Sequence, residues 1–207
     1  MTGAARRPPV IADVGPVAEA LAAGAMVGIP TDTVYGLAVA ASAPDAGARL
    51  ATAKGRDAAV AVQVLVADLA QADALAGPDG LSPAALCLAE RFWPGGITIV
   101  TDRRPGVSLD LGGDAGSVGL RWPDHDVVAG ILRQVGPVAA TSANLHGRPP
   151  LVRAADVAAA FAGTVAVVLD GGPGNLGAST VVDVRGDEPR LLREGAVSWE
   201  AVLAALS

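Results

Sequence analysis

The sequence predicts an α/β fold with a twisted, mixed, open sheet flanked by helices. Short apolar runs rich in valine intermix with stretches whose apolar residues recur at helical spacing, which is typical of strands and helices that share a core. Two apolar runs near the end of the chain, residues 179–184 and 190–192, flank a turn at Gly186 and Asp187. These two runs predict an antiparallel strand pair, so the sheet is expected to be mixed rather than parallel.

Helices are predicted from their spacing and from the residues at their ends. Gly24 follows one apolar, helically spaced stretch as a C-cap signal, and Ser82 with Pro83 begins another helix. Asp124 is expected to cap the helix after it, and Thr33 a short helix that contains the Tyr-Gly-Leu sequence. The predicted helices cover residues 14–23, 33–40, 45–52, 68–75, 83–91, 125–135, 154–161 and 198–206.

Strands are predicted where valine-rich runs are bounded by glycine, proline or polar residues. No repeat and no long linker divides the chain, and the glycine-rich stretches are expected to be loops, so residues 1–207 are expected to form a single domain. The predicted strands cover residues 25–29, 60–66, 97–100, 117–120, 138–140, 165–169, 179–184 and 190–192.

Composition limits the classes of function. The 207 residues carry a net charge of −6, which argues against nucleic-acid binding as the main activity. A negative net charge does not exclude a local basic cleft. The single cysteine, Cys87, excludes an internal disulfide and is expected to be a buried core thiol.

His125 and His146 lack metal-ligand spacing, so no metal site on the protein is predicted. The sequence contains no apolar run near the ~20 residues that span a bilayer and no secretory signal, so a cytoplasmic location is expected.

Polar side chains follow two of the predicted strands. Thr31 and Thr33 follow residues 25–29, and Thr141, Ser142 and Asn144 follow residues 138–140. Ligands of α/β proteins commonly bind at strand ends, so these residues are candidates for a binding site. The same residue types also cap turns and helices, and that structural interpretation stays open for each segment taken alone.

Cations and hydroxyls elsewhere in the chain suit an anionic ligand. Arg121 and Arg193 lie at strand ends, where a guanidinium can bind carboxylate or phosphate. Lys54 and Arg56, taken alone, are explained more simply as charges at a helix C-terminus, although they can also serve the ligand. The glycine-rich stretch over residues 171–180 can present backbone N–H groups to phosphate or form a plain turn, and it lacks the Walker pattern.

Seven blocks, in order along nearly the whole chain, resemble the YrdC-like family of threonylcarbamoyl-AMP synthases. No single block is specific, whereas the ordered set is. The blocks are residues 30–37 (PTDTVYGL), Lys54 with Arg56, residues 93–98 (WPGGIT), 118–121 (VGLR), 142–147 (SANLHG), 179–183 (STVVD) and 193–195 (REG).

The resemblance implies a twisted open sheet around a concave cleft. It also implies a specific reaction. L-threonine, bicarbonate and ATP, with Mg²⁺ accompanying the ATP, would give threonylcarbamoyl-AMP and pyrophosphate. The product would serve tRNA N6-threonylcarbamoyladenosine synthesis, so tRNA is an indirect partner through later enzymes, and tRNA-modification proteins are possible contacts. No membrane partner is implied.

The resemblance also assigns roles to individual residues. Lys54 and Arg56 would be catalytic as well as nucleotide-binding. Threonine would be held by Thr33, Arg121, Ser142 and Ser179. ATP would be held by Lys54, Arg56, Ser117, Thr141, Asn144 and Arg193.

The chain departs from the family pattern at four places that bear on affinity. Asp57 replaces a proline, Val60 an asparagine, Leu65 a histidine and His146 a serine. Any substrate contact from the replaced side chains is lost. Two alternatives to the synthase are a non-catalytic RNA-binding module of the same fold and a paralogue that carbamoylates another acceptor.

Overall fold

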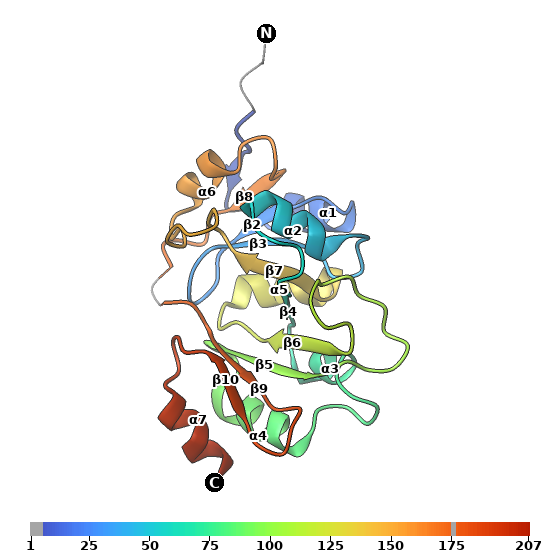
Figure 1. The fold of residues 1–207 in the computed structure, drawn as a ribbon. Coiled ribbons are helices and arrows are strands. Elements are labelled where there is room, and N and C mark those ends of the chain that lie inside the picture. The colour runs from blue at the N-terminus through green and yellow to red at the C-terminus, as the bar shows by residue number, and fades with distance from the viewer. Residues whose placement is uncertain (1–5, 175–176) are drawn as a thin grey trace.

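The computed structural model describes residues 6–174 and 177–207. Ten strands form one mixed sheet in the order β1-β8-β2-β3-β7-β4-β6-β5-β9-β10 (Figure 1). The strands are β1 (Val10–Ile11), β2 (Val27–Ile29), β3 (Gly36–Ala40), β4 (Gln63–Leu65), β5 (Ile97–Asp102), β6 (Ser117–Arg121), β7 (Val138–Ser142), β8 (Val167–Leu169), β9 (Thr180–Asp183) and β10 (Arg190–Arg193).

Helices cover the two faces of this sheet. Helix α1 packs on α5, and α4 packs on α7 at the opposite end of the molecule (Figure 1). None of the described helices has the length and apolar content needed to span a membrane. The helices are α1 (Gly15–Ala22), α2 (Ala46–Lys54), α3 (Leu69–Asp73), α4 (Pro83–Phe92), α5 (Asp126–Val135), α6 (Ala154–Ala160) and α7 (Trp199–Leu206).

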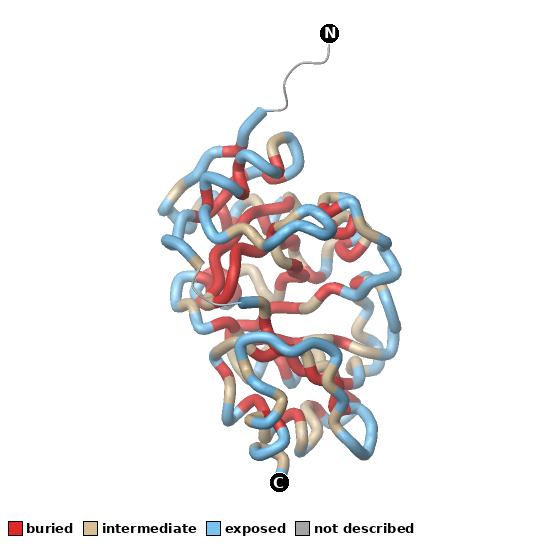
Figure 2. Tube along the Cα trace, turned by 60° about the vertical axis from the view of Figure 1, so that its left-hand side comes forward, coloured by how far each residue is buried: buried red, intermediate tan, exposed pale blue. Residues whose placement is uncertain are grey.

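Two hydrophobic cores lie on opposite faces of the sheet. Successive side chains of a strand point to opposite faces, and in β4 Val64 belongs to the larger core and Leu65 to the smaller one. The smaller core joins α1 to α5, for example through Leu21 and Leu132. The larger core takes residues from α2, α4, α6 and α7. Buried residues are concentrated in the strands, with exposed residues around them (Figure 2).

The mixed sheet flanked by helices is confirmed, including the antiparallel pairing of β9 with β10. The helix expected over residues 33–40 is wrong, because residues 36–40 form strand β3 between β2 and β7. Its side chains are buried on both faces, with Leu37 in the larger core and Ala38 in the smaller. An apolar run of this kind does not show alternation, so periodicity cannot separate it from a short helix.

Several smaller differences have local causes. His125, and not Asp124, caps α5, because its Nδ1 accepts from the backbone N–H of Val128 at 3.4 Å. The strand expected over residues 60–66 is shortened to β4, and Val60 is 51% exposed. The Cys87 thiol is only half-buried and donates to the Ala205 carbonyl. Strand β1 is too short to give a sequence signal.

Candidate active site

A cavity of about 380 Å³ opens over strands β4, β6, β5 and β9. In the central strands its lining alternates with the larger core: Gly119 and Arg121 face the cavity, whereas Leu120 between them is in the core. Eight of the ten predicted site residues line this one cavity. They are Thr33, Arg56, Ser117, Arg121, Thr141, Ser142, Ser179 and Arg193.

The other two predicted residues, Lys54 and Asn144, lie directly behind Ser142. The Lys54 ammonium, at the end of α2, donates to the Ser142 carbonyl at 2.7 Å, to its hydroxyl at 2.9 Å and to Asn144 Oδ1 at 2.6 Å. The pKa of Lys54 is lowered from 10.5 to about 8, mainly by burial and in addition by the nearby charges of Arg56 and Arg193. Lys54 therefore ties the end of α2 to the end of β7.

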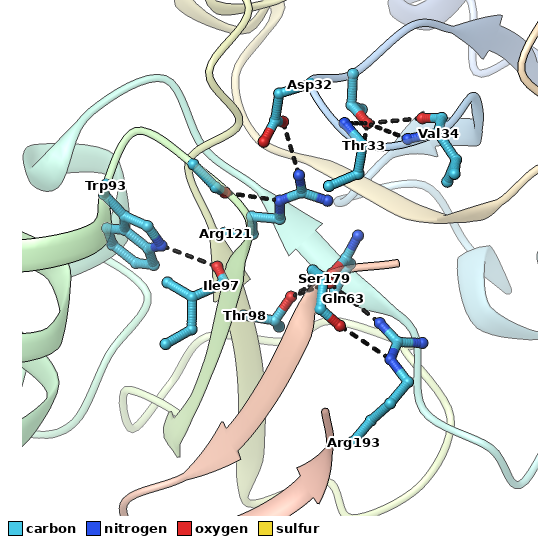
Figure 3. A network of polar contacts seen from close by, with 12 residues as sticks. Asp32, Thr33, Val34, Gln63, Trp93, Ile97, Thr98, Arg121, Ser179 and Arg193 are labelled. Carbon is cyan, nitrogen blue, oxygen red and sulfur yellow. Dashed lines mark hydrogen bonds and ion pairs between the residues drawn. The ribbon is translucent and has the colours of Figure 1, made fainter. Parts of the chain in front are cut away.

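Arg121 ends β6 as a buried cation at the cavity wall. Its Nη2 donates to Asp32 Oδ1 at 2.6 Å, and its Nε donates to the Gly95 carbonyl at 3.0 Å (Figure 3). The two charged side chains are only 3% and 10% exposed. Burial lowers the pKa of Arg121 while Asp32 raises it, and a guanidinium stays charged throughout the physiological range. The ion pair fixes the guanidinium in one orientation.

Thr31 explains why the chain turns after β2 instead of starting a helix. Its hydroxyl donates to the Val34 carbonyl at 2.6 Å and accepts from the backbone N–H groups of Thr33 and Val34, each at 3.2 Å. This local hydrogen bonding is an alternative to a helical turn. It places the Thr33 hydroxyl 2.9 Å from that of Thr31, on the cavity wall.

Four polar side chains form a connected chain across the cavity floor (Figure 3). Arg193 donates to the carbonyl and hydroxyl oxygens of Ser179 at 3.0 and 3.1 Å. The Ser179 and Thr98 hydroxyls lie 2.9 Å apart, and Thr98 donates to Gln63 Oε1 at 2.6 Å. Gln63, Thr98 and the Asp32 partner of Arg121 were not predicted from the sequence. None of the predicted site residues lies on β4 or β5, so alternation along these strands offers no signal for Gln63 or Thr98.

Arg56 lines the cavity and has no carboxylate partner among the described residues. Its Nη2 donates to the Val60 carbonyl at 3.1 Å, and its Nε is buried with no partner in that part of the chain. Burial lowers its pKa. Arg193 is more exposed than Arg56, and the pKa of its guanidinium is lowered by burial of that group and by the charge of Arg121. A cavity with several incompletely neutralised cations favours an anionic ligand.

A second group of charges at the rim is already neutralised. Arg185 pairs with Asp183 at 2.9 Å and with Asp114 at 2.7 Å, and Arg190 pairs with Asp183 at 3.1 Å. The hydrogen bond from Arg185 holds the pKa of Asp183 below its usual value. These pairs join the turn before β6 to β9 and β10, so we interpret them as support for the rim.

The four departures from the family pattern lie at different places. Val60 and Leu65 line the cavity with apolar side chains. Asp57 Oδ1 accepts from the backbone N–H of Ala59 at 2.9 Å in a turn, and His146 is exposed. The phosphate-binding interpretation of residues 171–180 falls partly outside the described residues, at positions 175–176.

A model of the Sua5/YciO/YrdC family, described as telomere recombination, matches residues 19–195. The chain belongs to this family. It is 43% identical over 190 residues to a putative threonylcarbamoyl-AMP synthase of Mycobacterium tuberculosis H37Rv, covering 90% of this chain and 86% of that protein. The expected resemblance is therefore confirmed.

Other members of the Sua5/YciO/YrdC family are longer. The threonylcarbamoyl-AMP synthase of Bacillus subtilis is 38% identical over 87% of this chain, which spans 53% of that protein. The crystal structure of P. abyssi Sua5 complexed with L-threonine superposes with a TM-score of 0.85 at 33% identity, covering 92% of this chain and 56% of that one.

Proposed function

We propose that this protein is an L-threonylcarbamoyladenylate synthase that acts in tRNA N6-threonylcarbamoyladenosine synthesis. The single observation that carries the proposal is one cavity that gathers eight predicted residues from distant parts of the chain. Relatives named threonylcarbamoyl-AMP synthase, and a related structure with L-threonine, support the same reaction. A cytoplasmic location and indirect partnership with tRNA through later enzymes belong to this proposal.

The substrates fit the charge of the cavity. ATP, bicarbonate and the threonine carboxylate are anions, and cations held in a partly dry site bind them more strongly than in water. We assign Thr33, Arg121, Ser142 and Ser179 to the amino acid. ATP is assigned to Lys54, Arg56, Ser117, Thr141, Asn144 and Arg193.

The proposed reaction has two bond-forming steps. The threonine amine attacks the carbon of bicarbonate, and loss of water leaves a carbamate. A carbamate oxygen then attacks the α-phosphorus of ATP while the bond to the β-phosphate oxygen breaks, which releases pyrophosphate. Positioning and charge stabilisation supply this kind of catalysis, with Lys54 and Arg56 stabilising charge on the phosphates, so no nucleophile on the protein is required.

We propose Mg²⁺ as the ion that accompanies ATP. Within residues 6–174 and 177–207 there is no group of three or more His, Cys, Asp or Glu side chains placed to hold a metal ion. Phosphate oxygens and water would therefore supply most of its ligands, which is the usual arrangement for Mg²⁺ with nucleotides. The ion would mask charge on the departing pyrophosphate.

Pyrophosphate release from ATP tests the proposal. We expect release that requires both L-threonine and bicarbonate, with serine as a much poorer substrate. Release that is indifferent to threonine would reject the synthase. Release that does not distinguish threonine from serine would favour the paralogue with another acceptor.

A further inference from the structure

We infer that Gln63 is a substrate-contacting residue whose carboxamide donates a hydrogen bond to an oxygen of the amino-acid substrate. The inference rests on the proposed function and deepens it. Gln63 lies on β4 and lines the same cavity as Thr33, Arg121 and Ser179, the residues assigned to threonine. Leu65, two residues further on the same face of β4, has no polar group to offer there.

The hydrogen bonds of the cavity floor have one direction. Arg193 can only donate, so the Ser179 hydroxyl accepts from it. Thr98 has one hydroxyl proton and gives it to Gln63 Oε1. The proton of the 2.9 Å bond between Ser179 and Thr98 must therefore come from Ser179. Both hydroxyl protons are committed, and the chain ends at the acceptor atom of Gln63.

The orientation of the Gln63 carboxamide follows from the position of its Oε1 beside the Thr98 hydroxyl. Because Oε1 accepts from Thr98, the amide nitrogen is the free end of the side chain. Gln63 Nε2 makes no hydrogen bond to any residue that the structure describes. It is also not one of the fully buried side-chain atoms without a partner, so its surface is exposed. It is thus accessible from the cavity as a donor, whereas Ser179 can only accept from a ligand.

Gly119 makes this arrangement possible. Strand β6 lies between β4 and β5, so the bond from Thr98 to Gln63 must pass over it at Gly119. A Cβ at Gly119 would lie 3.4 Å from the Thr98 methyl group and 4.0 Å from the Gln63 Cα. A longer side chain there would stand between the two partners. The missing side chain also leaves space for a substrate above the bond.

Two substitutions of Gln63 distinguish a residue that contacts the substrate from one that only holds Thr98 in place. In Gln63→Leu both roles are lost. In Gln63→Glu the carboxylate still accepts from Thr98, but the donor is gone and a negative charge faces the substrate carboxylate. A supporting role would leave Gln63→Glu like wild type, whereas contact with the substrate would make it the weaker of the two variants.

The experiment is calorimetric titration of each variant with L-threonine and, separately, with ATP, followed by the KM of each substrate. We expect Gln63→Leu to weaken threonine binding about ten-fold, as for one hydrogen bond to a charged group, and Gln63→Glu to weaken it further. ATP binding should be unchanged in Gln63→Leu. Thr98→Val should weaken threonine binding several-fold because it frees Gln63, and Thr98→Ser should restore it.

Wild-type threonine affinity in a folded Gln63→Glu protein would overturn the inference. Equal losses for threonine and ATP would overturn the assignment to the amino-acid side. Failure of the proposed function is seen separately, because wild-type protein would then release pyrophosphate without a requirement for threonine. Thermal unfolding of each variant verifies that the fold is retained.

Discussion

Arg56 provides the most direct test at the scale of single residues. Its guanidinium reaches the cavity with a buried Nε that has no partner among the described residues, so it contributes little to folding. We predict that Arg56→Ala weakens ATP binding by about ten-fold or more, the worth of a charge-assisted contact, and changes the free energy of unfolding by less than about 1 kcal/mol. Titration with ATP and thermal unfolding measure the two effects. Unfolding of the variant, or unchanged ATP affinity, would contradict this placement.

Thr33 tests the division of the cavity between the two substrates. Thr33→Val keeps the shape of the side chain and removes the hydroxyl that lies 2.9 Å from that of Thr31. We predict about a ten-fold rise in the KM for threonine with little change in that for ATP. Initial rates with each substrate varied in turn give both constants. Equal rises for the two substrates would show that the assignment is wrong.

Because of the lowered pKa of Lys54, we predict that rising pH has opposite effects on ATP affinity and on the free energy of unfolding. Its pKa is about 8 in the folded protein against 10.5 normally, so its charge is lost as pH rises through about 8. ATP affinity should fall over that range. Between about 8 and 10.5 the unfolded chain holds more protons than the folded protein, so the contribution of Lys54 to the free energy of unfolding rises with pH.

The matched control for this pH dependence is Lys54→Arg, which keeps a positive charge over the whole range. Titration with ATP at several pH values, together with denaturant unfolding at the same pH values, compares the two proteins. A fall in ATP affinity that is the same in Lys54→Arg as in wild type would assign the effect to another group.

At the scale of elements, Gly47 sets how closely α2 approaches the cavity wall. A Cβ there would lie 2.5 Å from the carbonyl carbon of Leu111, a residue that lines the cavity. We predict that Gly47→Ala lowers the free energy of unfolding by about 1–3 kcal/mol and weakens ATP binding, because α2 ends at Lys54. Denaturant unfolding and ATP titration measure these effects.

Gly130 in α5 is the control for Gly47, since a Cβ at Gly130 would meet no atom within 4 Å. Gly130→Ala should raise stability by up to about 1 kcal/mol, because alanine favours the helix. If both alanine variants are stabilised equally, close packing of α2 on Leu111 is not what Gly47 provides.

The same scale shows how far the sequence predicts the fold. Helices with capping residues, such as α4 with Ser82 and α7 with Ser198, were predicted to within a residue or two. Strand β3 was not, because tertiary pairing decides the structure of a short apolar run buried on both faces. The turn that Thr31 forms was missed for a related reason, since Thr33 before an apolar run resembles a helix cap.

For the whole molecule, the sequence predicted which residues would be gathered but not their partners. Lys54 and Arg193 could be selected as cations that suit an anion. That Lys54 lies behind Ser142, and that Arg193 begins a hydrogen-bonded chain to Gln63, depends on strand order and register. Strand order joins residues far apart in the sequence, and one sequence without its fold does not contain that information.

Charge distribution leads to a prediction about partners. The net charge is −6, whereas the cavity is lined by several cations, of which Arg56 and Arg193 have no carboxylate partner among the described residues. We therefore predict weak, strongly salt-dependent binding of tRNA, and ATP binding that persists at salt concentrations that abolish tRNA binding. Titrations with tRNA and with ATP over a series of salt concentrations measure this. Tight tRNA binding without nucleotide turnover would instead favour the RNA-binding module.

The most direct test asks whether the carbon of bicarbonate and the α-phosphorus of ATP enter the same product. The protein is incubated with isotope-labelled bicarbonate, L-threonine and ATP labelled in the α-phosphate, and the products are separated. We predict that both labels appear in one compound, threonylcarbamoyl-AMP, and that its rate of formation at limiting ATP falls about ten-fold or more in Arg56→Ala. Labels that never enter the same product, in the presence of all three substrates, would contradict a single cavity that joins them.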